Sequence, residues 1–138
     1  MRKCFIAAFL LFFAASLFAG WDNGAAAYES IKVRAKTAAT PYIVLVRADW
    51  CPWCQKLDAF LEDSAIDALF RDKLAVKITP DKGDAEKKIA KDLGVKGFPS
   101  MFVVLPNGSM QKISLPLKGS NKEMLDALRS QLDALYRK

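Results

Sequence analysis

Short apolar runs predict four strands in this chain. The first, Tyr-Ile-Val-Leu-Val at 42–46, has no polar position, which is typical of a strand buried on both faces. Runs at 74–79 and 101–105 fit the same interpretation, and Pro80 closes the first of these two. The turn sequence Pro-Asn-Gly-Ser then predicts a hairpin, so that 110–115 returns as the fourth strand.

Apolar positions at helical spacing predict helices between these strands. A segment rich in Ala, Lys and Glu at 28–39 is followed by Pro41, which ends it. The next helix is expected to begin at Pro52, since proline at the first helical position loses no hydrogen bond. We expect this helix to break near Asp63, before a short second piece that runs through Phe70.

Capping patterns predict where three helices begin. Ser64 with Asp67 resembles a capping pair for the short helix, and Asp84 is expected to cap the next one. Ser120, with a glutamate three residues later, predicts a capping box at the start of the last helix. Leucines then recur at helical spacing in this last segment.

The predicted order is helix, strand, helix, strand, helix, hairpin, helix. Two strands joined through a helix should lie parallel with a right-handed crossover, whereas the hairpin adds antiparallel strands. The sequence therefore predicts an α/β fold in one domain at 28–138. Its central mixed four-stranded sheet would be flanked by helices and preceded by a leading N-terminal helix.

The first 19 residues have the layout of a secretory signal peptide. Two basic residues precede an apolar run at 5–18, and small residues follow. The run is shorter than the ~20 residues that span a bilayer, although an uncleaved anchor is the alternative. We expect cleavage after Ala19, with Ala27 as a second choice, and a flexible leader at 20–27 that contains Trp21.

The composition fits an exported domain and excludes some kinds of site. Cys4 would leave with the signal peptide, so the mature chain would hold two cysteines. The chain has 21 Lys and Arg against 15 Asp and Glu, a net charge of +6, but its lysines are spread out as on a solvated surface. No segment resembles a nucleic-acid-binding module, and the absence of histidine removes the commonest metal ligand and general base.

The candidate chemistry lies in Trp-Cys-Pro-Trp-Cys at 50–54, where a strand pattern changes to a helix pattern. A thiol at the first turn of a helix meets the positive end of the helix dipole and unpaired N–H groups, which favour the thiolate. Cys51 and Cys54, one helical turn apart, are therefore candidates for thiol–disulfide exchange. A static disulfide or half of a zinc site is the alternative, but structural zinc usually needs four Cys or His ligands.

From about Tyr42 to its C-terminus the chain resembles the thioredoxin superfamily. The resemblance rests on Ala-Asp-Trp-Cys-Pro-Trp-Cys at 48–54, Gly-Phe-Pro at 97–99 and Pro-Asn-Gly at 106–108. Within the superfamily, the chain is most similar to exported thioredoxin-like domains and to the C-terminal domain of the transmembrane thiol:disulfide interchange reductase. This implies a thioredoxin-like fold and a protein thiol–disulfide oxidoreductase whose redox-active Cys51–Cys54 disulfide needs no cofactor.

The resemblance also implies roles for single residues. Cys51 corresponds to the exposed attacking nucleophile, and Cys54 corresponds to the buried resolving thiol. Pro99 matches a proline that is cis in this fold, and the backbone of Phe98 would pair with an extended substrate segment. The expected neighbours of the active site are Trp50, Pro52, Trp53 and Lys77. The tryptophans would supply apolar contact around the sulfurs, and Lys77 matches the position of a lysine that the family carries beside its buried Asp.

One position departs from the family pattern. Thioredoxins usually carry a buried Asp six residues before the first cysteine, and this chain has Leu45 there. Without that carboxylate, deprotonation of Cys54 would depend on water or another group. We therefore do not expect a fast general reductase of the thioredoxin kind.

Together these features predict a monomeric oxidoreductase in the periplasm or another extracytoplasmic space. Its partners would be protein thiols and disulfides and a membrane or periplasmic redox protein, with no nucleic acid and no metal. Resemblance to reductase domains favours the reductase or isomerase direction, although the Cys-Pro-x-Cys form hints at a potential above that of thioredoxin. The alternative is a non-catalytic binding protein or copper carrier that uses the dithiol.

Overall fold

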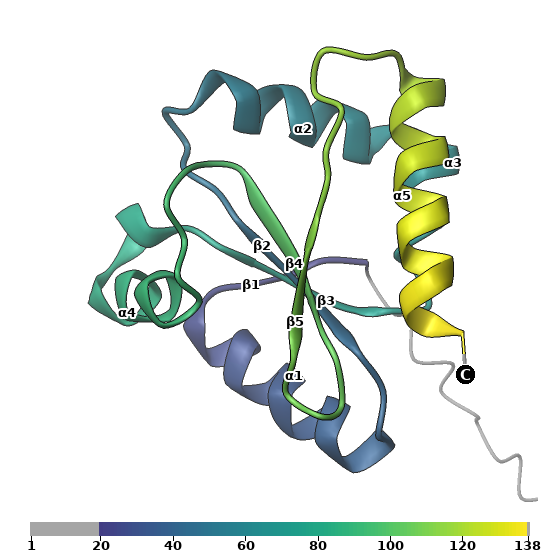
Figure 1. Cartoon of the computed structure of the whole chain (residues 1–138). Coiled ribbons are helices and arrows are strands. Elements are labelled where there is room, and N and C mark those ends of the chain that lie inside the picture. The colour runs from purple at the N-terminus through teal and green to yellow at the C-terminus, as the bar shows by residue number, and fades with distance from the viewer. Residues whose placement is uncertain (1–19, 138) are drawn as a thin grey trace, which may run out of the picture.

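The computed structural model describes residues 20–137, which form a mixed five-stranded sheet with helices on both faces (Figure 1). The strands are β1 (Asp22–Asn23), β2 (Tyr42–Val46), β3 (Leu74–Ile78), β4 (Ser100–Val104) and β5 (Met110–Ile113). The helices are α1 (Ala25–Ala38), α2 (Pro52–Glu62), α3 (Ser64–Asp67), α4 (Asp84–Asp92) and α5 (Asn121–Tyr136), with a 3-10 turn η1 (Pro80–Lys82). The predicted signal peptide, with Cys4, lies outside the described residues.

The strand order in the sheet is β1-β3-β2-β4-β5. Strand β2 lies parallel to β3 and antiparallel to β4, and β4 pairs with β5 as an antiparallel hairpin. The predicted α/β class and mixed sheet are thus confirmed. Because β2 is the central strand, the cysteine motif that follows it lies at the carboxyl end of the middle of the sheet, where sites in α/β folds form.

The sheet has one strand more than predicted, and the prediction of a flexible leader at 20–27 was wrong. Residues 22 and 23 form β1, which pairs in parallel with β3, and α1 begins at Ala25 instead of Tyr28. Next to this strand, the Trp21 ring packs on Phe70 with the ring centroids 4.9 Å apart. Sheet pairing and an aromatic contact therefore hold this segment against the domain.

Two apolar layers pack the sheet between the helices. On one face, α2, α3 and α5 cover Ile43 and Leu45 of β2 together with side chains of β4 and β5. On the other face, α1 and α4 cover Val44 and Val46 together with side chains of β3. Neighbouring residues of a strand point to opposite faces, so the unbroken apolar run of β2 contributes to both layers.

The predicted break between α2 and α3 is present, but its cap differs. The Asp63 carboxylate accepts the backbone N–H groups of Ala65 and Ile66, so Asp63 and not Ser64 caps α3. An aspartate in extended conformation just before a helix is well suited to this role. Helix α3 itself ends at Asp67, and turns lead on to Phe70.

The last two helices differ in how they begin. The capping box of Ser120 and Glu123 is present at the start of α5. The prediction that Asp84 caps α4 was wrong, because Gly83 takes the cap position and Asp84 is the first helical residue. Its carboxylate still lies at the positive end of the helix dipole. None of the helices described in residues 20–137 is long and apolar enough to cross a membrane.

Candidate active site

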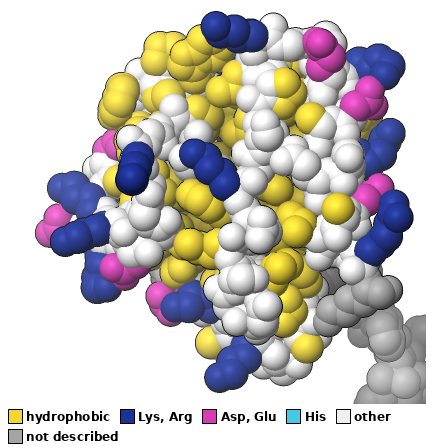
Figure 2. Space-filling view, viewed as in Figure 1, with side chains coloured by type: hydrophobic (Ala, Val, Ile, Leu, Met, Phe, Trp, Pro, Cys, Tyr) yellow, Lys and Arg dark blue, Asp and Glu magenta, His cyan; other side chains and the backbone are white. Residues whose placement is uncertain are grey.

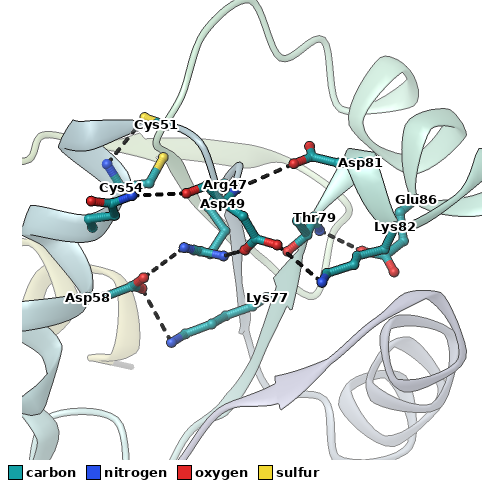
Figure 3. Close-up of polar contacts among 11 residues, drawn as sticks. Arg47, Asp49, Cys51, Cys54, Asp58, Lys77, Thr79, Asp81, Lys82 and Glu86 are labelled. Atoms are coloured by element: carbon teal, nitrogen blue, oxygen red, sulfur yellow. Dashed lines mark hydrogen bonds and ion pairs between the residues drawn. The ribbon is translucent and has the colours of Figure 1, made fainter.

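The cysteine motif begins α2, as its sequence predicts. Cys51 is the N-cap residue in an extended conformation, and Pro52 is the first helical residue. The backbone N–H of Cys54 donates to the Cys51 sulfur over 3.2 Å (Figure 3). The same N–H also donates to the Cys51 carbonyl over 3.1 Å, so the sulfur that attacks in the expected exchange reaction shares one N–H group of the first helical turn.

Both cysteines are free thiols and both are buried. Cys51 is 4% exposed and Cys54 is 1% exposed, so the prediction of an exposed Cys51 was wrong. Both sulfur-bearing residues pack with Ala48 and with the half-buried Phe98. The tryptophans on either side of Cys51 are the exposed residues here: Trp50 is 69% and Trp53 is 42% exposed.

The loop before β4 lies directly against the cysteine motif. The Phe98–Pro99 peptide bond is cis, and the Cys51 thiol donates a weak hydrogen bond to the Phe98 carbonyl over 3.7 Å. The Phe98 ring also meets Trp50 edge to face, with the centroids 6.1 Å apart. The structure thus brings together Phe98, Pro99 and the two cysteines, as the sequence interpretation requires.

A groove of about 570 Å³ opens beside the cysteine motif. Trp53, Phe98 and Pro99 line one part of it, and the loop at 115–118 lines the rest. A second hollow of about 380 Å³ shares Pro99 and continues toward β5. Figure 2 shows apolar side chains gathered over the part of this face where α2 begins. No sequence motif connects the loop at 115–118 to this site, because its residues lie more than 60 positions from the cysteines.

Burial governs the chemistry of the second cysteine. It raises the pKa of the Cys54 thiol to about 12, and the hydrogen bond with Cys51 acts in the same direction. A backbone hydrogen bond with Ala48 acts in the opposite direction and lowers the pKa of Cys54, and the positive charge of Arg47 adds a smaller contribution in this direction. Leu45, at the position of the family's buried carboxylate, is completely buried among apolar side chains.

A cluster of charged side chains lies beside this cysteine, which the sequence interpretation missed except for Lys77. The Arg47 guanidinium donates to Asp49 over 2.7 Å and to Asp58 over 2.8 Å. The Lys77 ammonium lies 3.6 Å from the other oxygen of Asp58, and Lys82 lies 3.1 Å from Asp49. Figure 3 shows Arg47 reaching from the end of β2 toward α2, with Asp58 and Lys77 below Cys54. Lys77 therefore belongs to this cluster, which it joins through its ion pair with Asp58.

A dithiol at the first turn of a helix, next to a cis-proline loop, defines a protein built for thiol–disulfide exchange. The chain belongs to the thioredoxin family, whose family model, described as "Thioredoxin", matches residues 25–131. Family membership and the Cys51–Cys54 pair make it a thiol–disulfide oxidoreductase.

Comparison with curated proteins finds relatives among larger enzymes. The chain is 32% identical over 98 residues to chloroplastic 5'-adenylylsulfate reductase 1 of Arabidopsis thaliana. The match covers 67% of this chain and 19% of the Arabidopsis protein. The chain therefore spans about a fifth of the length of the curated relatives that it matches.

Comparison with solved structures finds the same fold. A thioredoxin from Thermus thermophilus superposes with a TM-score of 0.61 at 21% identity, covering 80% of this chain and 85% of the other. The C-terminal domain of DsbD from Neisseria meningitidis, in its reduced form, gives a TM-score of 0.59 at 21% identity. This match covers 80% of this chain and 97% of the DsbD domain. These likenesses confirm the predicted thioredoxin-like fold.

Proposed function

We propose that this protein is a monomeric extracytoplasmic oxidoreductase that reduces or isomerises disulfides of partner proteins. The observation that carries the proposal is the position of the Cys51 sulfur, which lies between the helix start and the cis-proline loop. Its neighbours Trp53, Phe98 and Pro99 line a largely apolar groove. A substrate segment in this groove would present its disulfide to Cys51. The apolar walls would contact the side chains around that disulfide.

The reaction proceeds in two exchange steps. The Cys51 thiolate attacks one sulfur of the substrate disulfide, so that a Cys51–substrate disulfide forms and the other substrate sulfur leaves as a thiolate. The Cys54 thiolate then attacks the Cys51 sulfur, which forms the Cys51–Cys54 disulfide and releases the second substrate thiolate. The two substrate thiolates take up protons as the two cysteines lose theirs. The substrate gains two electrons and the cysteine pair loses them.

One feature of the sequence supports the location, and one structural likeness supports the partner and the direction. The basic, apolar and small segments at 1–20 have the order of a secretory signal, which favours export. Likeness to the C-terminal domain of DsbD supports a redox partner in the membrane or the periplasm and the reductase or isomerase direction. Fractionation of cells that express the tagged full chain tests the location, since retention in the cytoplasm would contradict it.

Insulin reduction with dithiothreitol tests the activity. We expect turnover by the wild type, none by Cys51→Ser, and accumulation of a mixed disulfide with insulin in Cys54→Ser. A reduction potential below about −240 mV in glutathione buffer would support a reductase, whereas one above about −160 mV would indicate an oxidant. Stoichiometric binding of Cu(I) by the dithiol without any insulin turnover would replace the proposal with the copper-carrier alternative.

A further inference from the structure

The Arg47 side chain is held in a fixed position beside Cys54. It is only 13% exposed, and its two terminal nitrogens are both engaged, one with Asp49 and one with Asp58. Its remaining nitrogen, Nε, is buried without a hydrogen-bond partner. Burying this side chain costs desolvation energy, and one of its hydrogen-bond donors is left unused. Stabilisation of the fold by a surface ion pair therefore explains its position poorly.

Two strands and a helix determine where this guanidinium lies. The Arg47 backbone N–H donates to the Ile78 carbonyl over 2.9 Å, which extends the pairing of β2 and β3 by one residue. Asp58 follows Cys54 by four residues on α2, so the two side chains lie on the same face of the helix. The bond from Arg47 to Asp58 therefore fixes the cation against the face of α2 that carries Cys54.

We infer that Arg47 is a positioning residue for the second exchange step, because its fixed positive charge favours the Cys54 thiolate that must attack the mixed disulfide. The inference rests on the proposed function and deepens it. With Leu45 in place of a buried carboxylate, no acid–base group occupies that position to take the Cys54 proton. The proton passes to water, and the cation makes its loss less costly.

The charged and titratable groups around Cys54 come from several parts of the chain, and they do not all shift its pKa in the same direction. Arg47 lowers the pKa of Cys54, whereas Cys51 raises it. The other groups of the cluster are the carboxylates of Asp49 and Asp58, which hold and partly neutralise Arg47, and Lys77 of β3, which is paired with Asp58. A change at Arg47 should therefore appear in the pH profile of the step in which Cys54 reacts.

Single-turnover reaction of the reduced protein with dithiodipyridine, a neutral chromogenic disulfide, separates the two steps. Attack by Cys51 releases the first thiopyridone in a phase that depends on the reagent concentration. Attack by Cys54 releases the second in a phase that does not. We expect the pH midpoint of the second phase to rise by about one unit in Arg47→Met, with about tenfold slower release below the midpoint.

Two further variants separate charge from structure. Arg47→Lys keeps a cation and should retain most of the wild-type midpoint, and Asp58→Asn keeps an acceptor but removes a neutralising charge, so its midpoint should fall. Arg71→Met, which breaks an exposed pair with Asp67, is the matched control and should leave both phases unchanged. Equal second-phase midpoints in wild type and Arg47→Met, or equal shifts in the Met and Lys variants, would overturn the inference. Absence of the first phase in the wild type would instead contradict the proposed function.

Discussion

The Lys77 ammonium lies 3.6 Å from the Asp58 carboxylate, so that an ion pair joins strand β3 to the helix that carries the cysteines. Lys77 pairs through its backbone with Leu45 in the β2–β3 register, and its ammonium also lies 5.7 Å from the centre of the Trp21 ring. One cation thus contacts the N-terminal segment and α2 at the same time. The Lys77 side chain is 23% exposed and the Asp58 side chain is 31% exposed, so this ion pair is intermediate between a surface pair and a buried one.

This intermediate burial predicts a modest coupling between Lys77 and Asp58. A double-mutant cycle with Lys77→Met and Asp58→Asn should give a coupling free energy of about 0.5–1 kcal/mol in urea unfolding. The pair of Lys87 and Asp84, at a similar separation of 3.5 Å but fully on the surface, is the control and should give a coupling near zero. Equal coupling in both cycles would show that burial does not strengthen the pair near the active site.

Trp21 is predicted to contribute to the stability of the whole domain. Its ring packs on Phe70 and borders the core layer of α2, α3 and α5. Trp21→Ala should therefore lower the free energy of unfolding by about 2–3 kcal/mol in urea denaturation. Trp21→Phe should cost less, because it keeps an aromatic ring and removes the buried Nε1 that has no hydrogen-bond partner. An unchanged unfolding midpoint in Trp21→Ala would mean that the segment before β1 does not pack on the domain in solution.

The sequence allowed most of the fold to be predicted because the main elements carry strong local patterns. The apolar run of β2, the proline that begins α2 and the Ser120 capping box all depend on neighbours in the sequence. Strand β1 could not be predicted in this way. Its two residues, Asp22 and Asn23, are both exposed and polar, and only pairing with β3, more than 50 residues later, makes them a strand.

The site was predictable where the motif itself specifies the geometry and unpredictable where distant side chains meet. The two cysteines and the loop with Phe98 and Pro99 were identified from short motifs. Arg47 and Asp58 are eleven residues apart on different elements, and each alone looks like an ordinary surface residue. The burial of Cys51 was missed because it depends on the packing of Phe98 and Ala48 with the two cysteines, which the spacing of the motif does not reveal.

The groove beside Cys51 is predicted to distinguish protein substrates from small disulfides. Leu117 lines both of its hollows, and Leu117→Gln keeps the volume of the side chain while making it polar. We expect kcat/KM for insulin to fall by about tenfold, whereas the first phase with dithiodipyridine should be unchanged. Val33→Gln, which alters an apolar side chain that is 66% exposed on α1, should change neither. Equal losses with insulin and with the small disulfide would indicate a disturbed active site instead of a lost substrate contact.

The raised pKa of Cys54 predicts that stability falls with increasing pH in a defined alkaline window. Burial raises the pKa of this thiol from its ordinary value near 9.0 to about 12. Below pH 9 the thiol is protonated in both the folded and the unfolded chain, so its contribution to stability is complete there. Between about pH 9 and 12 the unfolded chain has lost the proton that the folded chain keeps, and stability decreases as pH rises.

Comparison with Cys54→Ala isolates this effect. Burial also raises the pKa values of Tyr42 and Tyr136, so alkaline pH destabilises the fold through these residues in both proteins. The difference in unfolding free energy between wild type and variant, from urea titrations under reducing conditions, should therefore change by on the order of a few kcal/mol between pH 8 and pH 11. The wild type should lose stability relative to the variant as the pH rises, because only the wild type has a Cys54 thiol that can ionise. A difference that stays constant over this range would mean that the Cys54 thiol ionises as readily in the folded chain as in the unfolded one, and the cation at Arg47 would then outweigh burial.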